Sequence, residues 1–307
     1  MPARRLLSIG DLSPADVDAL LDAAAWYLPR VAAGELKLAS LRGVSTLLMF
    51  FEPSTRTRVS FELAAKLLGS DTISVTSSGS SVEKGESVVD TAQTLSAMGF
   101  HVAVVRHRSA DSVELFAQHF AGAVINGGAG RAEHPTQALL DAAVLKRAGM
   151  LEAGRHLAIV GDILHSRVAR SDMHALTKLG AEVTLVGPTT LLPESFKQFG
   201  VRICHDLMEG IEGADVINIL RIQTERMSAN FFPSIREYRL LYGITRERLR
   251  AAKPDVMIMH PGPINRGVEI DQDVADGPHS VIHRQVTNGV AVRMAVLYLL
   301  ANQRGGE

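Results

Sequence analysis

Seven short apolar runs, separated by amphipathic stretches, constrain the fold more than any other feature of the sequence. They lie at residues 45–51, 101–106, 123–126, 156–162, 182–188, 214–221 and 255–261. Continuous apolar runs of this length between helices are typical of parallel strands that are buried on both faces. The sequence therefore predicts an α/β fold built from doubly wound parallel sheets. Before the first run, Ser13 with Asp16 three residues on is a capping arrangement, which predicts a helix that begins there and stops near Pro29.

The chain has 307 residues, which is enough for two domains that each have a full core. A helical stretch at 135–150, followed by a glycine-containing segment, marks the expected boundary. We predict a first domain at 1–137, joined by a C-terminal helix at 290–307, and a second domain at 138–289, with the active site in the cleft between them.

The charge balance excludes several classes of partner. Lys and Arg number 32 and Asp and Glu number 33, so no broad positive surface is expected for nucleic acid or an anionic membrane.

No secretory signal or run of about 18 apolar residues is found, so we expect a cytoplasmic protein. The single cysteine, Cys204, excludes an internal disulfide and cysteine-based zinc sites, and its strand-like surroundings predict a buried bystander.

Polar clusters follow most of the apolar runs. In open parallel sheets, ligands bind beyond the carboxyl ends of the strands, so these clusters are the candidate site. The clusters are rich in arginine and histidine, and their candidate residues are Ser54, Thr55, Arg56, Thr57, Arg106, His134, Gln137, Arg167, Arg221, Gln223, Gly262 and Pro263.

The stretch "FFEPSTRTRVSFE", residues 51–63, predicts an anion cradle. Pro53 ends the strand, and a helix begins at Ser54 or Thr55, where unpaired N–H groups, hydroxyls and a guanidinium come together. The spacing is neither that of a P-loop nor that of a dinucleotide-binding loop. The alternative is a well-capped surface helix whose arginines are solvated.

Other stretches carry weaker signals. Lys84, in the serine-rich stretch 76–87, can swing into a site as a compact positive charge, although a flexible linker has the same composition. His134 and Gln137 suit recognition of a carbonyl or amide group, or a structural role. Arg167 at a helix start suits a ligand carboxylate, whereas Arg170 suits an ion pair behind the sheet.

Seven motifs, taken in order, resemble the transcarbamoylase family. They are S-T-R-T-R, K-G-E, V-R-H, H-P-T-Q, the helix start at Arg167, R-I-Q-T-E-R and H-P-G-P-x-x-R-G-x-E. The resemblance is to the members that act on L-aspartate, because the ornithine-specific members carry H-C-L-P and S-M-G where this chain has "HPGP" and no S-M-G. It implies carbamoyl transfer from carbamoyl phosphate to L-aspartate, which gives N-carbamoyl-L-aspartate and phosphate, the committed step of pyrimidine (UMP) biosynthesis.

The resemblance also implies a role for each candidate residue. The catalytic residues are Arg56, Thr57, Arg106 and His134. Carbamoyl phosphate is bound by Ser54, Thr55, Arg56, Thr57, Arg106, His134 and Gln137. Aspartate is bound by Lys84, Arg167, Arg221, Gln223, Gly262 and Pro263. Ser80 and Lys84 come from a neighbouring subunit, with Ser81 as an alternative to Ser80.

The reaction needs no covalent nucleophile from the protein, because the aspartate amine is itself the nucleophile. We expect no metal and no organic cofactor. The resemblance further implies a homotrimer, with a regulatory chain or a dihydroorotase as a possible further partner. The alternatives are a transcarbamoylase for another amino acid such as ornithine, and an inactive scaffold chain in a pyrimidine-pathway complex.

Overall fold

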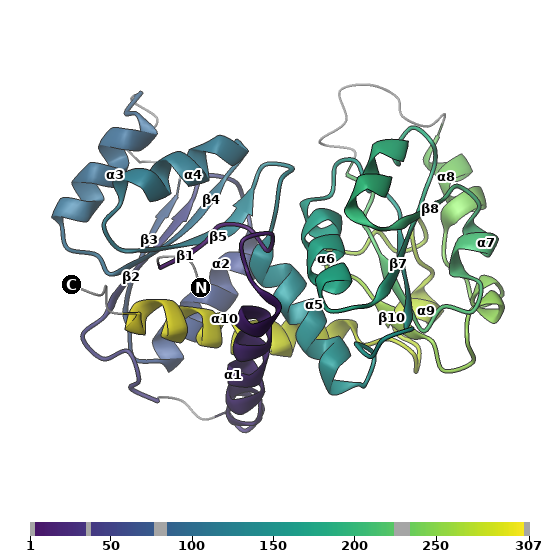
Figure 1. Ribbon diagram of the computed structural model, residues 1–307, viewed down its shortest axis with the longest axis horizontal. Coiled ribbons are helices and arrows are strands. Elements are labelled where there is room, and N and C mark those ends of the chain that lie inside the picture. The colour runs from purple at the N-terminus through teal and green to yellow at the C-terminus, as the bar shows by residue number, and fades with distance from the viewer. Residues whose placement is uncertain (1–3, 35–37, 77–84, 224–233, 304–307) are drawn as a thin grey trace. The chain divides into compact units, whose positions relative to one another are not determined.

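The structure is a computed structural model that describes residues 4–34, 38–76, 85–223 and 234–303. Each of its two compact units contains one five-stranded sheet whose neighbouring strands are all parallel (Figure 1). Helices flank both sheets, and the predicted α/β fold with parallel sheets is confirmed. Within the described residues, no helix is both long and apolar enough to cross a membrane.

The first unit comprises residues 1–143 with 287–307, and the second unit comprises residues 144–286. The two units divide after residues 143 and 286. The boundaries expected from the sequence follow residues 137 and 289. Both divisions fall inside a helix, so each of two helices contributes residues to both units.

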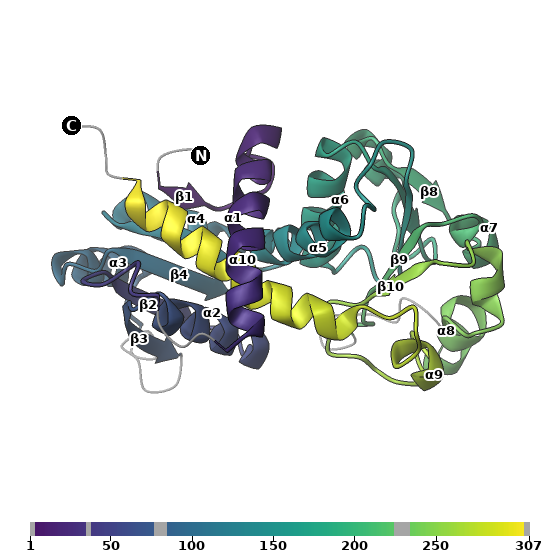
Figure 2. The same ribbon diagram turned by 90° about the horizontal axis from the view of Figure 1, so that it is seen from below.

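The sheet of the first unit has the strand order β1-β5-β4-β2-β3. Its strands are β1 (Arg5–Leu6), β2 (Ser45–Phe50), β3 (Asp71–Thr76), β4 (Val102–His107) and β5 (Ala123–Ala129). Its helices are α1 (Pro14–Ala32), α2 (Thr55–Leu67), α3 (Val88–Ala97), α4 (Ala110–His119) and the larger parts of α5 (Pro135–Arg147) and α10 (Ile282–Asn302). Helices α3 and α4 cover one face, and α1, α2 and α10 lie on the opposite side (Figures 1 and 2).

The core of the first unit forms where the helices meet the strands. Ala92 of α3 and Phe116 of α4 pack in one cluster with Leu47 and Met49 of β2. Burying a side chain of the size of Phe116 stabilises a fold by about 1.5–3 kcal/mol. Phe61 of α2 is also fully buried, and this fixes the helix that begins at the predicted cradle.

The sheet of the second unit has the strand order β10-β9-β6-β7-β8. Its strands are β6 (His156–Val160), β7 (Glu182–Val186), β8 (Arg202–Cys204), β9 (Val216–Ile219) and β10 (Met257–Met259). Its helices are α6 (Arg167–Lys178), α7 (Leu207–Ile211), α8 (Ile235–Tyr242), α9 (Gln272–Ala275) and the 3₁₀ helices η2 (Glu194–Phe199) and η4 (Arg248–Ala251). Met173 of α6 packs with one set of strand residues, and Ile211 of α7 and Tyr238 of α8 pack with the other set.

Each of the seven predicted apolar runs coincides with a strand or with part of one. Three further strands were not predicted or were only indicated. These are β1, β3 and β8, and each lies at an edge of its sheet. No residue of β3 is fully buried, so its sequence "DTISVT" shows no apolar run. Only the strand-like surroundings of Cys204 had indicated β8. An edge strand has one strand neighbour instead of two, so burial constrains its sequence less.

The boundaries of α1 and α10 were predicted with unequal accuracy. Ser13 and Asp16 form the predicted capping box at the start of α1. The end predicted near Pro29 is wrong, because α1 continues to Ala32 with Pro29 inside it, and the Pro29 carbonyl accepts the N–H of Ala33 at 2.9 Å. Helix α10 begins at Ile282, eight residues before the predicted start at 290.

The prediction for the single cysteine is confirmed. Cys204 is buried, and its thiol donates to the carbonyl oxygen of Asp206 at 3.1 Å. Burial raises the pKa of this thiol, so the reactive thiolate form is disfavoured.

Candidate active site

The predicted anion cradle lies at the N-terminus of α2, directly after β2. Ser54 occupies the N-cap position with extended backbone angles of φ −161° and ψ 100°, and its side chain makes no capping hydrogen bond. The first turn of α2 contains no acidic residue. The positive end of the helix dipole is therefore not offset by a carboxylate of its own first turn, as an anion-binding helix terminus requires.

Arg106 lies at the end of β4, where it is the register partner of Phe50 at the end of β2. Its side chain is 8% exposed, and its Nη1 donates to the Gly127 carbonyl oxygen at 3.2 Å. Its Nη2 lies 3.1 Å from Oε1 of Glu52, which follows β2. The β2–β4 pairing therefore carries Arg106 to the same sheet edge as the cradle, and Glu52 holds the guanidinium there.

His134 connects α5 to the cradle. It directly precedes Pro135, the first residue of α5, and is 5% exposed. Its Nε2 lies 3.4 Å from the hydroxyl oxygen of Thr57 in the first turn of α2, which is a long and therefore weak hydrogen bond. Two predicted carbonyl-polarising groups from segments far apart in the chain thus lie next to each other.

Gln137 lies in the first turn of α5, and its backbone N–H donates to the His134 carbonyl oxygen at 2.9 Å. Its Nε2 is 3.2 Å from both carboxylate oxygens of Asp141, one helical turn further along. The first unit therefore brings together the cradle, Arg106, His134 and Gln137, all at the carboxyl ends of β2, β4 and β5 and the helix starts that follow.

In the second unit, Asp162 organises the loop after β6. Gly161, at φ +131°, gives the chain a turn that a side chain would obstruct, because a Cβ there would lie 2.9 Å from the Leu220 carbonyl oxygen. Asp162 Oδ1 accepts the backbone N–H of His165 at 3.2 Å and lies 2.8 Å from its Nδ1. Arg167 then begins α6 and is 5% exposed.

The same carboxylate also holds the segment after β9, the neighbour of β6 in the sheet. Asp162 Oδ2 accepts the backbone N–H of Gln223 at 3.4 Å, and Gln223 Nε2 donates to the His165 carbonyl oxygen at 3.3 Å. Arg221 lies in this segment, two residues before Gln223. The segments that carry Arg167 and Arg221 are therefore linked to each other through Asp162 and Gln223.

A buried hydrogen bond between His260 and Glu269 holds the turn after β10. The Gly262 N–H donates to His260 Nδ1 at 2.8 Å, so Nε2 carries the proton of a neutral imidazole and faces Glu269 Oε1 at 3.2 Å. The same oxygen accepts the N–H of Asn265 at 2.6 Å. The Gly262–Pro263 peptide bond is cis. Glu269 therefore fixes both ends of the turn predicted to contact aspartate.

Tyr238 of α8 is completely buried between these two loop systems. Burial raises the pKa of its hydroxyl, and the nearby Glu269 and Asp162 carboxylates raise it further. The two carboxylates therefore share one buried environment inside the second unit.

Two site predictions fall outside the residues that the structure describes. They are Ser80, with its alternative Ser81, and Lys84, which were expected to come from a neighbouring subunit. The sequence analysis had also pointed to Arg170, whose Nη2 donates to the Leu164 carbonyl oxygen at 3.0 Å and whose guanidinium lies 5.0 Å from the Phe196 ring centre.

The residues that the sequence analysis missed are the carboxylates that hold the predicted cations and amides. They are Glu52 and Asp141 in the first unit and Glu269 in the second unit. A signal was present for Asp141, which stands four residues after Gln137 on the same helical face. Glu269 is the last residue of the motif H-P-G-P-x-x-R-G-x-E, but the sequence analysis assigned it no role. Among the described residues, no group of three or more His, Cys, Asp or Glu side chains could hold a metal ion.

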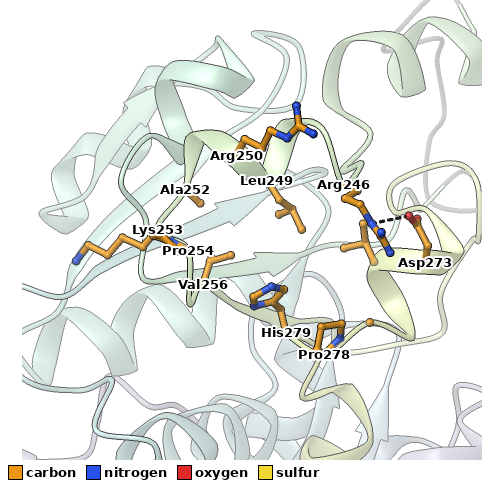
Figure 3. Close-up of a pocket in the computed structure, with 12 residues that line it drawn as sticks. Arg246, Leu249, Arg250, Ala252, Lys253, Pro254, Val256, Asp273, Pro278 and His279 are labelled. Carbon is orange, nitrogen blue, oxygen red and sulfur yellow. Dashed lines mark ion pairs between the residues drawn. The ribbon is translucent and has the colours of Figure 1, made fainter.

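A pocket of about 550 Å³ lies elsewhere in the second unit (Figure 3). Val256 and Pro254 line it from the segment that precedes β10, whereas the predicted site residues follow that strand. Arg246 is paired with Asp273 at 3.2 Å, and Figure 3 shows Arg250 and Lys253 directed away from His279. The lining includes none of the predicted site residues.

Two family models together match nearly the whole chain. The model described as "Aspartate/ornithine carbamoyltransferase, carbamoyl-P binding domain" matches residues 4–147. The model described as "Aspartate/ornithine carbamoyltransferase, Asp/Orn binding domain" matches residues 153–300. The chain therefore belongs to the aspartate/ornithine carbamoyltransferase family, which confirms the resemblance of its motifs.

Within that family, proteins named "Aspartate carbamoyltransferase catalytic subunit" are similar over the full length. The one from Moorella thermoacetica is 52% identical, and the match covers 96% of each protein. The one from Agrobacterium fabrum is also 52% identical, and the match covers 100% of this chain and 98% of that protein.

Solved structures of both branches of the family have a similar backbone. Aspartate transcarbamoylase from Trypanosoma cruzi in complex with N-(phosphonacetyl)-L-aspartic acid has a TM-score of 0.86 at 32% identity, over 96% of this chain and 94% of that chain. Ornithine carbamoyltransferase from Pyrococcus furiosus has a TM-score of 0.86 at 30% identity, over 98% of both chains. Backbone similarity therefore does not distinguish the two branches.

Proposed function

We propose that this chain is an aspartate carbamoyltransferase. It transfers the carbamoyl group of carbamoyl phosphate to the amine of L-aspartate and releases N-carbamoyl-L-aspartate and phosphate, the committed step of pyrimidine biosynthesis. The full-length similarity to proteins named as catalytic subunits of this enzyme supports the proposal. The structural observation that carries it is that the segments bearing Arg167 and Arg221 are linked through Asp162 and Gln223, which suits a ligand with two carboxylates.

Carbamoyl phosphate binds the first unit through its phosphate group. The helix N-terminus, Ser54, Thr55 and Arg56 hold the phosphate oxygens, and Arg106 bridges the phosphate and the carbonyl. Both substrates are anions, and two unit charges 4 Å apart interact by about 1 kcal/mol in water and by more in a drier site. The cations of the site offset this repulsion.

The carbonyl group is activated by hydrogen-bond donors. Thr57, Arg106 and His134 polarise the carbonyl oxygen and stabilise the oxyanion that develops when the amine attacks the carbon, and a good donor of this kind contributes on the order of 10²- to 10³-fold in rate. Gln137 binds the carbamoyl NH₂ group. The C–N bond forms as the C–O bond to phosphate breaks, and the departing phosphate accepts the amine proton.

Aspartate binds the second unit. Arg167 and Arg221 bind its two carboxylates with the help of Gln223, and the backbone carbonyls at Gly262 and Pro263 orient its amine. Ornithine has one carboxylate and a cationic side chain, so it offers no second anionic group to pair with the second arginine.

The proposal includes a homotrimer in the cytoplasm, in which Lys84 and Ser80 reach the site of a neighbouring chain. Lys84→Ala and Arg56→Ala chains should each be inactive alone. If sites are shared between chains, mixing the two variants under exchange conditions should restore activity. No recovery after demonstrated subunit exchange would show that each chain supplies its own Lys84.

The reaction is tested by phosphate release from carbamoyl phosphate with the purified chain, using L-aspartate and L-ornithine in parallel. We expect release with aspartate only, loss of activity in Arg56→Ala, and retention in the matched control Arg58→Ala. Activity with ornithine alone would establish the second candidate function, carbamoyl transfer to ornithine. The similarity of the backbone to that of the ornithine carbamoyltransferase from Pyrococcus furiosus is the observation that favours this second candidate. Inactivity of the chain with both acceptors would favour a scaffold role.

A further inference from the structure

A buried arginine in the first unit lies outside the predicted site. Arg293 of α10 is 4% exposed, and its Nη1 donates to the Gly289 carbonyl oxygen at 3.0 Å. Burial lowers the pKa of Arg293 to about 10, and the Asp141 carboxylate acts in the opposite direction. A buried cation is tolerated only when an opposite charge or good hydrogen bonds compensate it, and the negative charge of Asp141 favours the charged form of Arg293.

The space around Arg293 is shaped for its guanidinium group. The Cζ atom lies 5.2 Å from the ring centre of Phe61 in α2, a favourable cation–π contact. A Cβ at position 289 would lie 2.6 Å from Arg293 Nη1 and 3.2 Å from Leu140 Cδ2, so glycine leaves room for the guanidinium. Arg293 therefore lies between α2, which begins at the cradle, and α5, which carries Gln137.

Asp141 in turn determines which way the Gln137 amide faces. An ionised carboxylate only accepts hydrogen bonds, and both of its oxygens lie 3.2 Å from the same Gln137 nitrogen. The reverse orientation would place the amide oxygen against the carboxylate. Gln137 and Asp141 are 8% and 1% exposed, so little water can reach the two groups to screen that repulsion.

We propose that Asp141 is a positioning residue that makes the Gln137 Oε1 atom the acceptor for the carbamoyl NH₂ group. This inference rests on the proposed function and deepens it. It makes Asp141 the source of selectivity for a carbamoyl group, which donates N–H hydrogen bonds, over an acetyl group, which presents a methyl at the same place. A site built around such a hydrogen bond rejects analogues that lack the donor.

The test compares carbamoyl phosphate with acetyl phosphate in the wild-type chain, in Asp141→Asn and in the exposed control Asp71→Asn. Acetyl phosphate is measured as a substrate, by phosphate release with L-aspartate, and as a competitive inhibitor. An asparagine at position 141 can donate as well as accept, so the Gln137 amide is free to turn. We expect kcat/KM for carbamoyl phosphate to fall on the order of 10- to 100-fold, with acetyl phosphate turnover and inhibition nearly unchanged.

A purely structural role for Asp141 would lower the values for both acyl phosphates by the same factor, and this result would overturn the inference. The same conclusion follows if the wild-type chain does not prefer carbamoyl phosphate. Failure of the proposed function would look different, because the wild-type chain would then transfer no carbamoyl group to aspartate.

If Asp141→Asn does not fold, the double variant Asp141→Asn/Arg293→Met provides the same readout. It also removes the buried cation whose charged form Asp141 favours, and replacing two buried charges together is often tolerated. Selective loss with carbamoyl phosphate in the folded double variant supports the inference, and equal loss with both acyl phosphates contradicts it.

Discussion

The two units hold their predicted site residues in different ways. In the first unit, side chains hold side chains, as Glu52 holds the Arg106 guanidinium and Asp141 holds the Gln137 amide. In the second unit, buried carboxylates hold the backbone of loops, as Asp162 accepts N–H groups of His165 and Gln223. The first arrangement directs functional groups, and the second arrangement shapes the chain that carries them.

This difference predicts how each half of the site fails. Removing a side chain in the first unit should change ligand contacts while the backbone stays in place, because α2 and α5 are fixed by their own cores. Removing a loop-holding carboxylate in the second unit leaves buried N–H groups without an acceptor, which costs about 1–3 kcal/mol for each group. Stability and ligand affinity should then change together.

Arg106→Ala is expected to have the largest effect. It removes a charge-assisted donor to the phosphate and carbonyl, and kcat/KM for carbamoyl phosphate should fall about 10³-fold. The Glu52 carboxylate would then repel the substrate, so Arg106→Ala/Glu52→Gln should recover part of the loss. The exposed Arg108→Ala is the control. A fall in kcat/KM with an unchanged melting temperature would support a side-chain role. A folding defect in Arg106→Ala would contradict the expectation that the backbone of the first unit stays in place.

Asp162→Ala should affect stability and aspartate affinity together. The change removes the acceptor of two His165 N–H groups and of the Gln223 N–H, and we expect a loss of roughly 3 kcal/mol in the free energy of unfolding. The KM for aspartate should rise while the KM for carbamoyl phosphate stays the same. Urea unfolding and initial rates measure both effects, with the exposed Asp255→Ala as control. A loss of stability without a change in the aspartate KM would contradict the loop-holding role.

Asp215 is a buried carboxylate of the second unit that lies away from the predicted site, at the amino end of β9. It can therefore be compared with the loop-holding carboxylate of Asp162. Burial opposes its ionisation, but Lys253, the His156 N–H and Arg155 together lower the pKa of Asp215 to about 2. A carboxyl whose pKa is depressed on folding stabilises the protein above the unfolded pKa of about 3.9, and this stability is lost as the pH falls through the folded pKa. The shift corresponds to about 2 kcal/mol.

Asp215→Asn should therefore flatten the fall in unfolding free energy between pH 5 and pH 2, relative to the wild type. The aspartate KM at neutral pH should not change, because Arg221 follows β9 at its other end. Urea unfolding across this pH range is the measurement. An altered aspartate KM would mean that buried carboxylates of this unit influence the site regardless of their position.

Glu269→Gln should have the smallest effect. A glutamine oxygen can still accept from His260 and from the Asn265 N–H, so the turn at Gly262 and Pro263 should persist and the aspartate KM should change by about threefold or less. Glu269→Leu removes the acceptor and should raise the aspartate KM more. Equal effects of the two changes would show that the charge, rather than hydrogen bonding, holds this turn.

The sequence analysis was most accurate where the pattern is local. The apolar runs predicted the central strands, and Ser13 with Asp16 predicted the start of α1. It failed for β3, whose edge position leaves its residues exposed or half-buried, and for the end of α1, where the Pro29 carbonyl still accepts a helical hydrogen bond from the Ala33 N–H. Burial decides how apolar a strand sequence must be, and this constraint is weak at the edge position of β3.

For the site, the sequence analysis named cations, hydroxyls and amides because motifs at strand ends carry them. The roles of Arg56, Arg167 and the other named residues stay predictions, and Ser80 and Lys84 lie outside the described residues. The analysis missed the carboxylates that orient these groups. The importance of Glu52 is visible only from its contact with Arg106, whereas Asp141 had the signal of its helical spacing from Gln137.

The sequence alone determined the residue types, the strand and helix rhythm and the capped start of α1, because caps and hydrophobic periods depend on neighbours within a few positions. The tertiary structure decided the strand order β1-β5-β4-β2-β3 and the contact between Thr57 and His134. Such pairings join residues far apart in the chain, and they form because the packing of a whole sheet and its helices leaves one arrangement in which apolar faces are covered and buried charges are compensated.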